Sequence, residues 1–148
     1  MRRDAVTTIT VGTALRLTYR AFARDLAHRL QPHGVTLLMW FVLRELWKRD
    51  GLSQSEIAAA TDRQASAIVS VVRALQDAGL VRVTRSTTDG RRSVVRLTAA
   101  GRRLEPVLTA HGRRLSQAAQ RGFTAAERRA LIGMLARLRR NIASNGEG

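Results

Sequence analysis

The sequence predicts a mainly helical chain that carries one small β-hairpin. Most apolar residues recur every three or four positions, which is the spacing of one face of an α-helix. Two short β-type runs depart from this pattern, and a turn-prone tip from Thr87 to Arg92 separates them. These runs cover residues 80–85 and 93–97. The chain is 148 residues long, a length that suits one domain with a sizeable core.

The other elements are organised around residues 52–98. Ser53 and Glu56 have the spacing of a capping box, in which each side chain satisfies the other residue's free backbone N–H, and they open a short helix. A turn at residues 62–64 leads to a second helix over residues 65–78, which stops at Gly79. The predicted buried side of this helix consists of Ile68, Val71, Val72 and Leu75. Helix, turn, helix and basic hairpin in this order predict a winged helix-turn-helix.

Further helices are expected on both sides of this unit. An apolar stripe runs through residues 11–31 and stops at Pro32 and Gly34. Thr36 is the expected N-cap of a helix reaching Arg49, which is apolar nearly all round and should therefore be central. After the hairpin we expect a long helix from Thr98 to Gly122 and a last helix opened by a capping box, Thr124 to Glu127. These helices cover residues 99–142.

We therefore predict a single domain over residues 1–148, with residues 36–98 as the winged helix-turn-helix unit. The stripes of residues 11–31 and 99–142 have only this small unit to pack against. They are better explained as dimerisation helices that bury one another across a two-fold axis in a homodimer.

The charge of the chain points to a polyanionic partner. There are 26 Lys and Arg residues against 11 Asp and Glu, giving a formal net charge of +15, and every basic residue except Lys48 is an arginine. Arginine presents a planar fork of donors that suits phosphates and guanine edges. Seven arginines and a single acid, Asp89, lie between residues 81 and 103. We therefore expect double-stranded DNA as the partner.

The wing carries a resemblance to a known family. Gly79-Leu80-Val81, Asp89-Gly90-Arg91, Val95-Arg96-Leu97-Thr98 and Gly101 resemble the wing signature of the MarR (multiple antibiotic resistance regulator) family of bacterial transcription factors. Supporting similarities extend from about Leu15 to Ile142. Three positions depart from the family pattern. Gly90 replaces a basic residue, Arg63 stands where a hydrophobic residue usually closes the helix-turn-helix, and Val83 stands where arginine is common.

This resemblance implies a sequence-specific transcriptional regulator that binds a pseudo-palindromic operator as a homodimer, and we expect it to be a repressor. The helix of residues 65–78 is expected in the major groove and Arg91 at the minor groove, held by an ion pair with Asp89 as in the family. Phosphate contacts are expected from Ser53, Arg85, Arg92 and Arg96. The complete set of predicted DNA-binding residues is Ser53, Gln64, Ala65, Ser66, Ser70, Arg73, Arg85, Asp89, Arg91, Arg92 and Arg96.

The resemblance also suggests a small aromatic or phenolic anion that releases the DNA. Tyr19, Trp40, Arg44, Trp47 and His111 are the candidates for an aromatic wall and a partner for a carboxylate. The alternative, tryptophans in the core and a solvated Arg44, is at least as good for each residue. A zinc site at His28, His33 and His111 lacks the usual ligand spacing, so we expect no metal or other cofactor.

Other classes of protein fit less well. The sequence has no Gly-rich phosphate loop, nucleophile elbow or paired carboxylates, so we do not expect an enzyme. A winged helix that serves only as a protein-interaction module remains an alternative, although it does not require arginines on the hairpin and its flanks. No apolar run is long enough to span a membrane, and Asp4 and Arg16 interrupt any leader-like start, so we expect a cytoplasmic protein without membrane contact.

Overall fold

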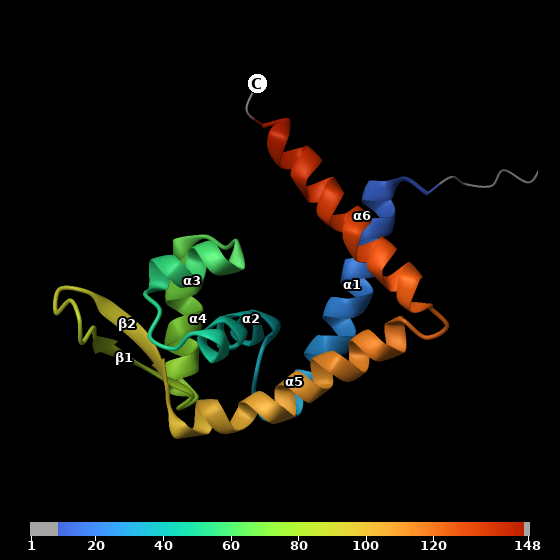
Figure 1. Cartoon of the computed structure of the whole chain (residues 1–148). Coiled ribbons are helices and arrows are strands. Elements are labelled where there is room, and N and C mark those ends of the chain that lie inside the picture. Colours follow the sequence, from blue (N-terminus) through green and yellow to red (C-terminus); the bar gives the residue numbers. More distant parts are fainter. Residues whose placement is uncertain (1–8, 147–148) are drawn as a thin grey trace, which may run out of the picture. The chain divides into compact units, whose positions relative to one another are not determined.

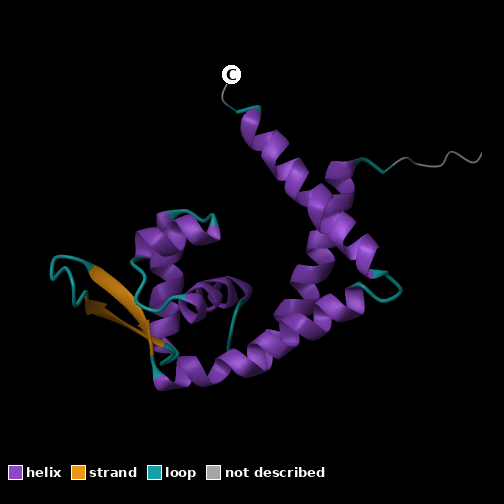
Figure 2. Ribbon diagram, viewed as in Figure 1, coloured by secondary structure: helices purple, strands orange, loops and turns teal. Residues whose placement is uncertain are grey.

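The computed structural model describes residues 9–146, and the start of the chain weighed above as a leader lies outside them. Helices make up most of the described chain, and the hairpin supplies its two strands (Figures 1 and 2). The elements are α1 (Val11–Leu30), the short 3-10 helix η1 (Gln31–His33), α2 (Leu37–Lys48), α3 (Gln54–Thr61), α4 (Ala65–Asp77), β1 (Val81–Arg85), β2 (Ser93–Leu97), α5 (Ala99–Ala119) and α6 (Ala125–Ser144). The predicted fold class, mainly α with a small β-hairpin wing, is confirmed.

The chain divides into two compact units between Arg113 and Arg114, within α5. The first unit contains α1 to α4, the hairpin and most of α5, and the second contains the end of α5 and α6. The predicted domain organisation, with its dimerisation helices, stays a prediction. No helix among the described residues is long and apolar enough to cross a membrane.

Helix α2 is the centre of the first unit, as its composition predicted. It contacts α1, α3, α4 and β2, and five of its side chains are buried. Thr36 caps it, because the Thr36 hydroxyl oxygen accepts a hydrogen bond from the backbone N–H of Met39 at 3.2 Å. The buried core joins α2 to the end of α1, to α3 and α4, to the hairpin and to α5. Its fully buried large side chains include Leu30, Leu43, Leu46, Ile57, Ile68, Leu75 and Leu108.

The helix-turn-helix forms where it was expected. Asp62 ends α3 in the left-handed conformation, with φ of 51°, and α4 begins three residues later at Ala65. All four residues predicted for the inner side of α4 are buried. That side fixes α4 against the core, and the opposite side stays open to solvent.

Only one half of the predicted capping box at α3 is present. The Ser53 hydroxyl oxygen accepts a hydrogen bond from the backbone N–H of Glu56 at 3.2 Å, as expected. The Glu56 carboxylate, however, binds the guanidinium groups of Arg49 and Arg92. The reciprocal bond to Ser53 was therefore a wrong prediction, because two positive charges compete for the carboxylate with a neutral N–H.

The hairpin is tied to the helices at its base. Strands β1 and β2 are antiparallel, with Val81 opposite Leu97 and Arg85 opposite Ser93. Leu52 forms an isolated bridge to Val95, so the segment before α3 lies along the outer side of β2. Figure 1 shows the hairpin, in yellow tones, projecting from the cluster of α2, α3 and α4. The tip of the hairpin therefore extends away from a base that is held on both sides.

The start of α5 is locked to the base of the hairpin. Thr98 caps α5 by accepting a hydrogen bond from the Gly101 N–H at 3.1 Å, and its own hydroxyl donates to the carbonyl oxygen of Gly79 at 2.7 Å. A Cβ atom on Gly101 would lie only 2.2 Å from the carbonyl oxygen of Leu80. Glycine at position 101 is therefore required for this close approach.

The second unit leaves several of its large apolar side chains exposed. The capping box of Thr124 and Glu127 is confirmed in both directions, at 3.1 and 2.7 Å. None of the described residues of α6 is buried, although its predicted stripe of Leu131, Met134, Leu135 and Leu138 is present. Such a stripe on an exposed helix indicates a surface that is covered by something else.

Candidate nucleic-acid interface

The outward side of α4 presents the residues that the sequence predicted. Gln64, Ala65, Ser66, Ser70 and Arg73 are all exposed. Because Gln64 is the N-cap of α4, it lies at the same end of the helix as Ala65 and Ser66. Small and polar side chains at that end leave room for a close approach to another surface.

One residue of this side was missed. Val69 is 48% exposed and lies three residues after Ser66 and four before Arg73, which places it among them on the helix surface. Helical spacing alone identifies its position. Its apolar character, however, is usually read as a mark of the core.

Arg63 lies in the turn before α4 and is exposed. Its backbone N–H donates to the carbonyl oxygen of Ala58 at 3.0 Å, which helps to close the end of α3. The residue that departs from the family pattern therefore adds a charge at the surface.

The tip of the hairpin is organised by Asp89, but not through the predicted ion pair. Asp89 accepts a hydrogen bond from the backbone N–H of Arg91 through its carboxylate, at 3.1 Å, and one from the Arg92 N–H through its carbonyl oxygen, at 3.0 Å. None of the ion pairs within residues 9–146 involves Asp89 or Arg91. The predicted ion pair is wrong for this structure, because the carboxylate instead closes a turn with the nearby backbone.

At the tip, the Arg85 side chain is held by a hydrogen bond, whereas no hydrogen bond among the described residues holds the Arg91 side chain. The Arg85 guanidinium donates to the carbonyl oxygen of Gly90 at 2.8 Å, which braces the turn from inside the hairpin. Arg91 is exposed, and the turn fixes only its backbone. Its guanidinium therefore projects from an ordered base with its donors available to a partner.

The base of the wing holds a charged network that involves two of the predicted phosphate contacts. The Glu56 carboxylate pairs with Arg49 at 2.8 Å and with Arg92. The Arg92 guanidinium also donates to the Ser53 hydroxyl at 2.9 Å. Arg92 and Ser53 are thus already engaged within the protein, and the network joins the end of α2, the start of α3 and the start of β2.

Arg96 lies on β2, beside the same segment before α3 that Arg92 contacts. It packs over Gly51, where an added Cβ would lie 2.9 Å from its Nη1 atom. Nearby, Asp50 accepts hydrogen bonds from the backbone N–H groups of Gly51 and Leu97, both at 2.9 Å, and pairs with Arg102 at 3.1 Å. Arg96 is therefore positioned by packing, while Asp50 fixes the strand beneath it.

Three of the five candidate effector residues lie together on α2. Trp40 and Trp47 meet edge to face, with ring centroids 5.8 Å apart, and the Arg44 guanidinium lies 5.6 Å from the centre of the Trp40 ring. Trp40 is buried, and the Trp47 indole N–H donates to the carbonyl oxygen of Gly101 at 3.0 Å. Both tryptophans therefore have structural roles.

The remaining two candidates, His111 and Tyr19, lie on other helices, α5 and α1. The His111 ring contacts His33, with 3.2 Å between their Nε2 atoms. Tyr19 is 53% exposed on α1. The part of the chain that the structure describes has no group of three or more His, Cys, Asp or Glu residues placed to hold a metal ion.

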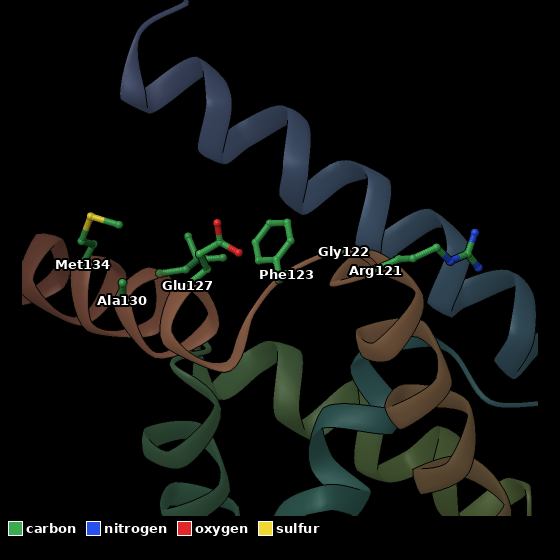
Figure 3. Close-up of a pocket in the computed structure, with 7 residues that line it drawn as sticks. Arg121, Gly122, Phe123, Glu127, Ala130 and Met134 are labelled. Carbon is green, nitrogen blue, oxygen red and sulfur yellow. The ribbon is translucent and has the colours of Figure 1, made fainter.

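Each unit has a shallow hollow among its described residues. The first unit has a hollow of about 480 Å³ between the end of α1 and the start of α2, lined by Ala27, His28, Gln31, Gly34, Val35, Thr36 and Leu37. The second unit has a hollow of about 470 Å³ lined by Arg121, Gly122, Phe123, Glu127, Ala130, Leu131 and Met134. Figure 3 shows Phe123 in the loop before α6, Glu127 and Met134 on α6, and Arg121 extending away from them. Neither hollow is lined by a candidate effector residue.

A helix-turn-helix followed directly by a basic hairpin defines the class of winged helix-turn-helix DNA-binding proteins. The family model for the MarR family matches residues 35–93, which span α2 to the tip of the hairpin. A putative transcriptional regulatory protein for the hcr operon of Thauera aromatica is 35% identical over 122 residues, covering 82% of this chain and 72% of that protein.

Solved structures show that this chain has the same fold as two other proteins. The S. aureus MepR–DNA complex has a TM-score of 0.82 at 20% identity, covering 90% of this chain and 97% of that one. Bordetella bronchiseptica BpsR, whose DNA binding is regulated by 6-hydroxynicotinic acid, has a TM-score of 0.77 at 24% identity, covering 86% and 97%. This chain therefore belongs to the MarR family and is a DNA-binding transcriptional regulator, not a member of an enzyme family.

Proposed function

We propose that the protein is a homodimeric repressor that binds a pseudo-palindromic operator. In this proposal α4 of each copy enters the major groove and Arg91 of each wing reaches the adjacent minor groove. The observation that carries the proposal is the contrast between the two sides of α4. One side is fully buried, and the other exposes small, polar and basic side chains beside a hairpin with a free arginine.

The roles of the predicted residues follow from their surroundings. Gln64, Ser66, Ser70 and Arg73 are proposed to contact bases or nearby phosphates, and Ala65 to allow close approach. Arg85 and Asp89 order the tip that carries Arg91. Arg96 and the network of Ser53 and Arg92 are proposed to face phosphates along the flanks of the site.

The homodimer is supported by the exposed apolar side chains of the terminal helices. On α1 and just before it, Ile9, Val11, Leu15, Leu17, Tyr19 and Phe22 are 37–59% exposed. In the second unit, Phe123, Leu131, Ile132, Met134 and Ile142 are 39–69% exposed. A second copy would bury such surfaces, and two copies of α4 would then read half-sites about one helical turn of DNA apart.

Release by an aromatic anion is proposed at Arg44. Its guanidinium is exposed and is held over the Trp40 ring, which supports a role for Arg44 in binding the carboxylate of such an anion. BpsR offers a parallel, since 6-hydroxynicotinic acid has this chemistry. Tyr19 and His111 are secondary candidates.

The deciding experiment is a mobility-shift titration against the DNA upstream of the protein's own gene, with a scrambled duplex as control. We expect specific binding at least a thousandfold tighter than to the scrambled duplex, with an affinity that falls steeply as salt is added. A reporter driven by the bound fragment should be expressed more strongly when the gene is deleted. Equal affinity for both duplexes would instead support the protein-interaction module, and lower reporter expression would indicate an activator.

A further inference from the structure

Val69 is an unusual residue for its place. The described residues contain several exposed large apolar side chains, and apart from Val69 they lie on or just before α1, on α5 or α6, or in the loop before α6. Val69 alone lies between residues 36 and 98, in the winged helix-turn-helix unit, and it is 48% exposed. The proposed homodimer would cover the apolar surface of the terminal helices, whereas Val69 lies outside those helices.

Packing within the unit does not explain Val69 either. The inner side of α4 is filled by Ile68, Val71, Val72 and Leu75, which are at most 6% exposed. Valine is also a poorer helix former than alanine, because its branched Cβ is restricted against the preceding turn. Neither the core nor the helix therefore requires valine at position 69.

The neighbours of Val69 define what it can touch. Ala65 and Ser66 precede Val69 by about one helical turn, and Ser70 follows it directly. The side chains of these three exposed neighbours are all smaller than that of valine. Arg73 follows one turn later and is exposed. The Val69 side chain thus protrudes beyond its smaller neighbours as an apolar group, with Ser66 before it and Arg73 after it as residues that can form hydrogen bonds.

The major groove offers one apolar group that matches this contact. Among the base edges exposed there, only thymine carries a methyl group, at C5, while the other groups are hydrogen-bond donors and acceptors. The Val69 side chain is held largely in one rotamer by its helix, so its two methyl groups have fixed positions. A fixed apolar surface selects thymine over cytosine by shape and by the water it displaces.

We propose that Val69 is a specificity-determining residue that contacts the C5 methyl group of a thymine in each half-site. This inference rests on the proposed function, because it requires α4 to lie in the major groove. Burying one methyl group changes the affinity about fourfold, so the symmetric pair of half-sites gives a change of about fifteenfold.

The test replaces thymine by deoxyuridine, which removes only this methyl group. The operator is first obtained by selection from random duplexes, and each symmetric pair of thymines is then exchanged in turn. Wild-type protein should lose about fifteenfold in affinity at one pair. Val69→Ala should bind the unmodified operator more weakly and show no difference between thymine and deoxyuridine at that pair.

Controls separate this inference from the function on which it rests. Gln76→Ala alters another exposed residue of α4 and should keep the wild-type sensitivity to deoxyuridine. Thermal melting of Val69→Ala should match wild type, because alanine favours the helix. The inference is overturned if wild type tolerates every exchange or if Val69→Ala keeps the full difference. If no duplex is selected, the proposed function itself fails.

Discussion

At the scale of single residues, two residues of the same type can differ in the space around them or in the partners they bind. Gly101 has no room for a side chain because α5 begins against the carbonyl oxygen of Leu80. Gly90, at the wing tip, has no neighbour within 4 Å of an added Cβ. Arg91 and Arg92 are adjacent, yet the first is open to a partner and the second is bound to Glu56.

Gly101→Ala is expected to destabilise the fold by about 2 kcal/mol or more, because a methyl group 2.2 Å from a carbonyl oxygen forces α5 away from the hairpin. Urea unfolding followed by circular dichroism measures the change. Gly90→Ala is the matched control and should alter the free energy of unfolding by less than about 0.5 kcal/mol. Similar values for the two variants would contradict the close approach.

Arg91→Ala is expected to weaken operator binding by about 1–3 kcal/mol, since its exposed guanidinium is proposed to enter the minor groove. Fluorescence anisotropy at physiological salt measures the affinity. Arg128→Ala removes the same charge from α6 and should have little effect. Equal losses from both variants would show that only net charge matters, and the wing assignment would then be abandoned.

At the scale of elements, one carboxylate connects three of them. Glu56 lies in the first turn of α3 and binds Arg49 after α2 and Arg92 before β2. These pairs are partly exposed, so each contributes little to stability. Their consequence is electrostatic. Glu56 neutralises part of the positive charge of Arg49 and Arg92, so less of it is available to DNA phosphates at the start of α3 and the base of the wing.

Glu56→Gln is therefore expected to release Arg49 and Arg92 toward phosphates. Affinity for non-specific DNA at low salt should rise several-fold, and the slope of log affinity against log salt should steepen by about 0.9 for each phosphate gained. Glu105→Gln makes the same charge change at an exposed position of α5. If both variants shift the slope equally, the network does not mask these arginines.

At the scale of the whole molecule, the dominant feature is the apolar surface of the terminal helices. The core of the first unit is well filled, with eighteen buried residues in one cluster, whereas α6 has no buried residue among those described. A helix of this kind gains little stability alone, because helices in proteins are stabilised mainly by packing of their apolar side. Dimerisation is the simplest way to provide that packing.

Light scattering at micromolar concentration is expected to give a mass about twice the 16.4 kDa of one chain. Met134→Asp places a charge on the exposed apolar stripe and should shift the population to the monomer. Gly133→Asp adds the same charge one position away, on the arginine-rich side of α6, and should remain dimeric. A monomeric wild type would exclude the proposed assembly.

Binding of an aromatic acid is expected to change the affinity of the homodimer for its operator. Aromatic carboxylic acids, tested by thermal shift, should raise the melting temperature of wild type and lower its operator affinity. Arg44→Gln removes the proposed carboxylate partner and should abolish both effects while it preserves DNA binding without ligand. A response that persists in Arg44→Gln would place the effector elsewhere.

Local order along the chain determined most of the fold. Apolar spacing predicted the five long helices as well as α3, and Thr36, Thr98 and Thr124 are caps as expected. Turn residues located the hairpin, although β1 begins at Val81, one residue later than predicted. These features depend on interactions within a few residues, which a single sequence displays directly.

Tertiary structure decided which side chains remain available. Glu56 and Arg92 are 36 positions apart, and their pairing replaced the predicted capping bond because folding brings α3 and β2 together. The exposure of Val69 likewise follows from how the elements pack. The sequence by itself therefore determined the winged helix-turn-helix and its basic character. Only the tertiary structure decided how its charges are shared, because distant residues compete for the same partner once the chain is folded.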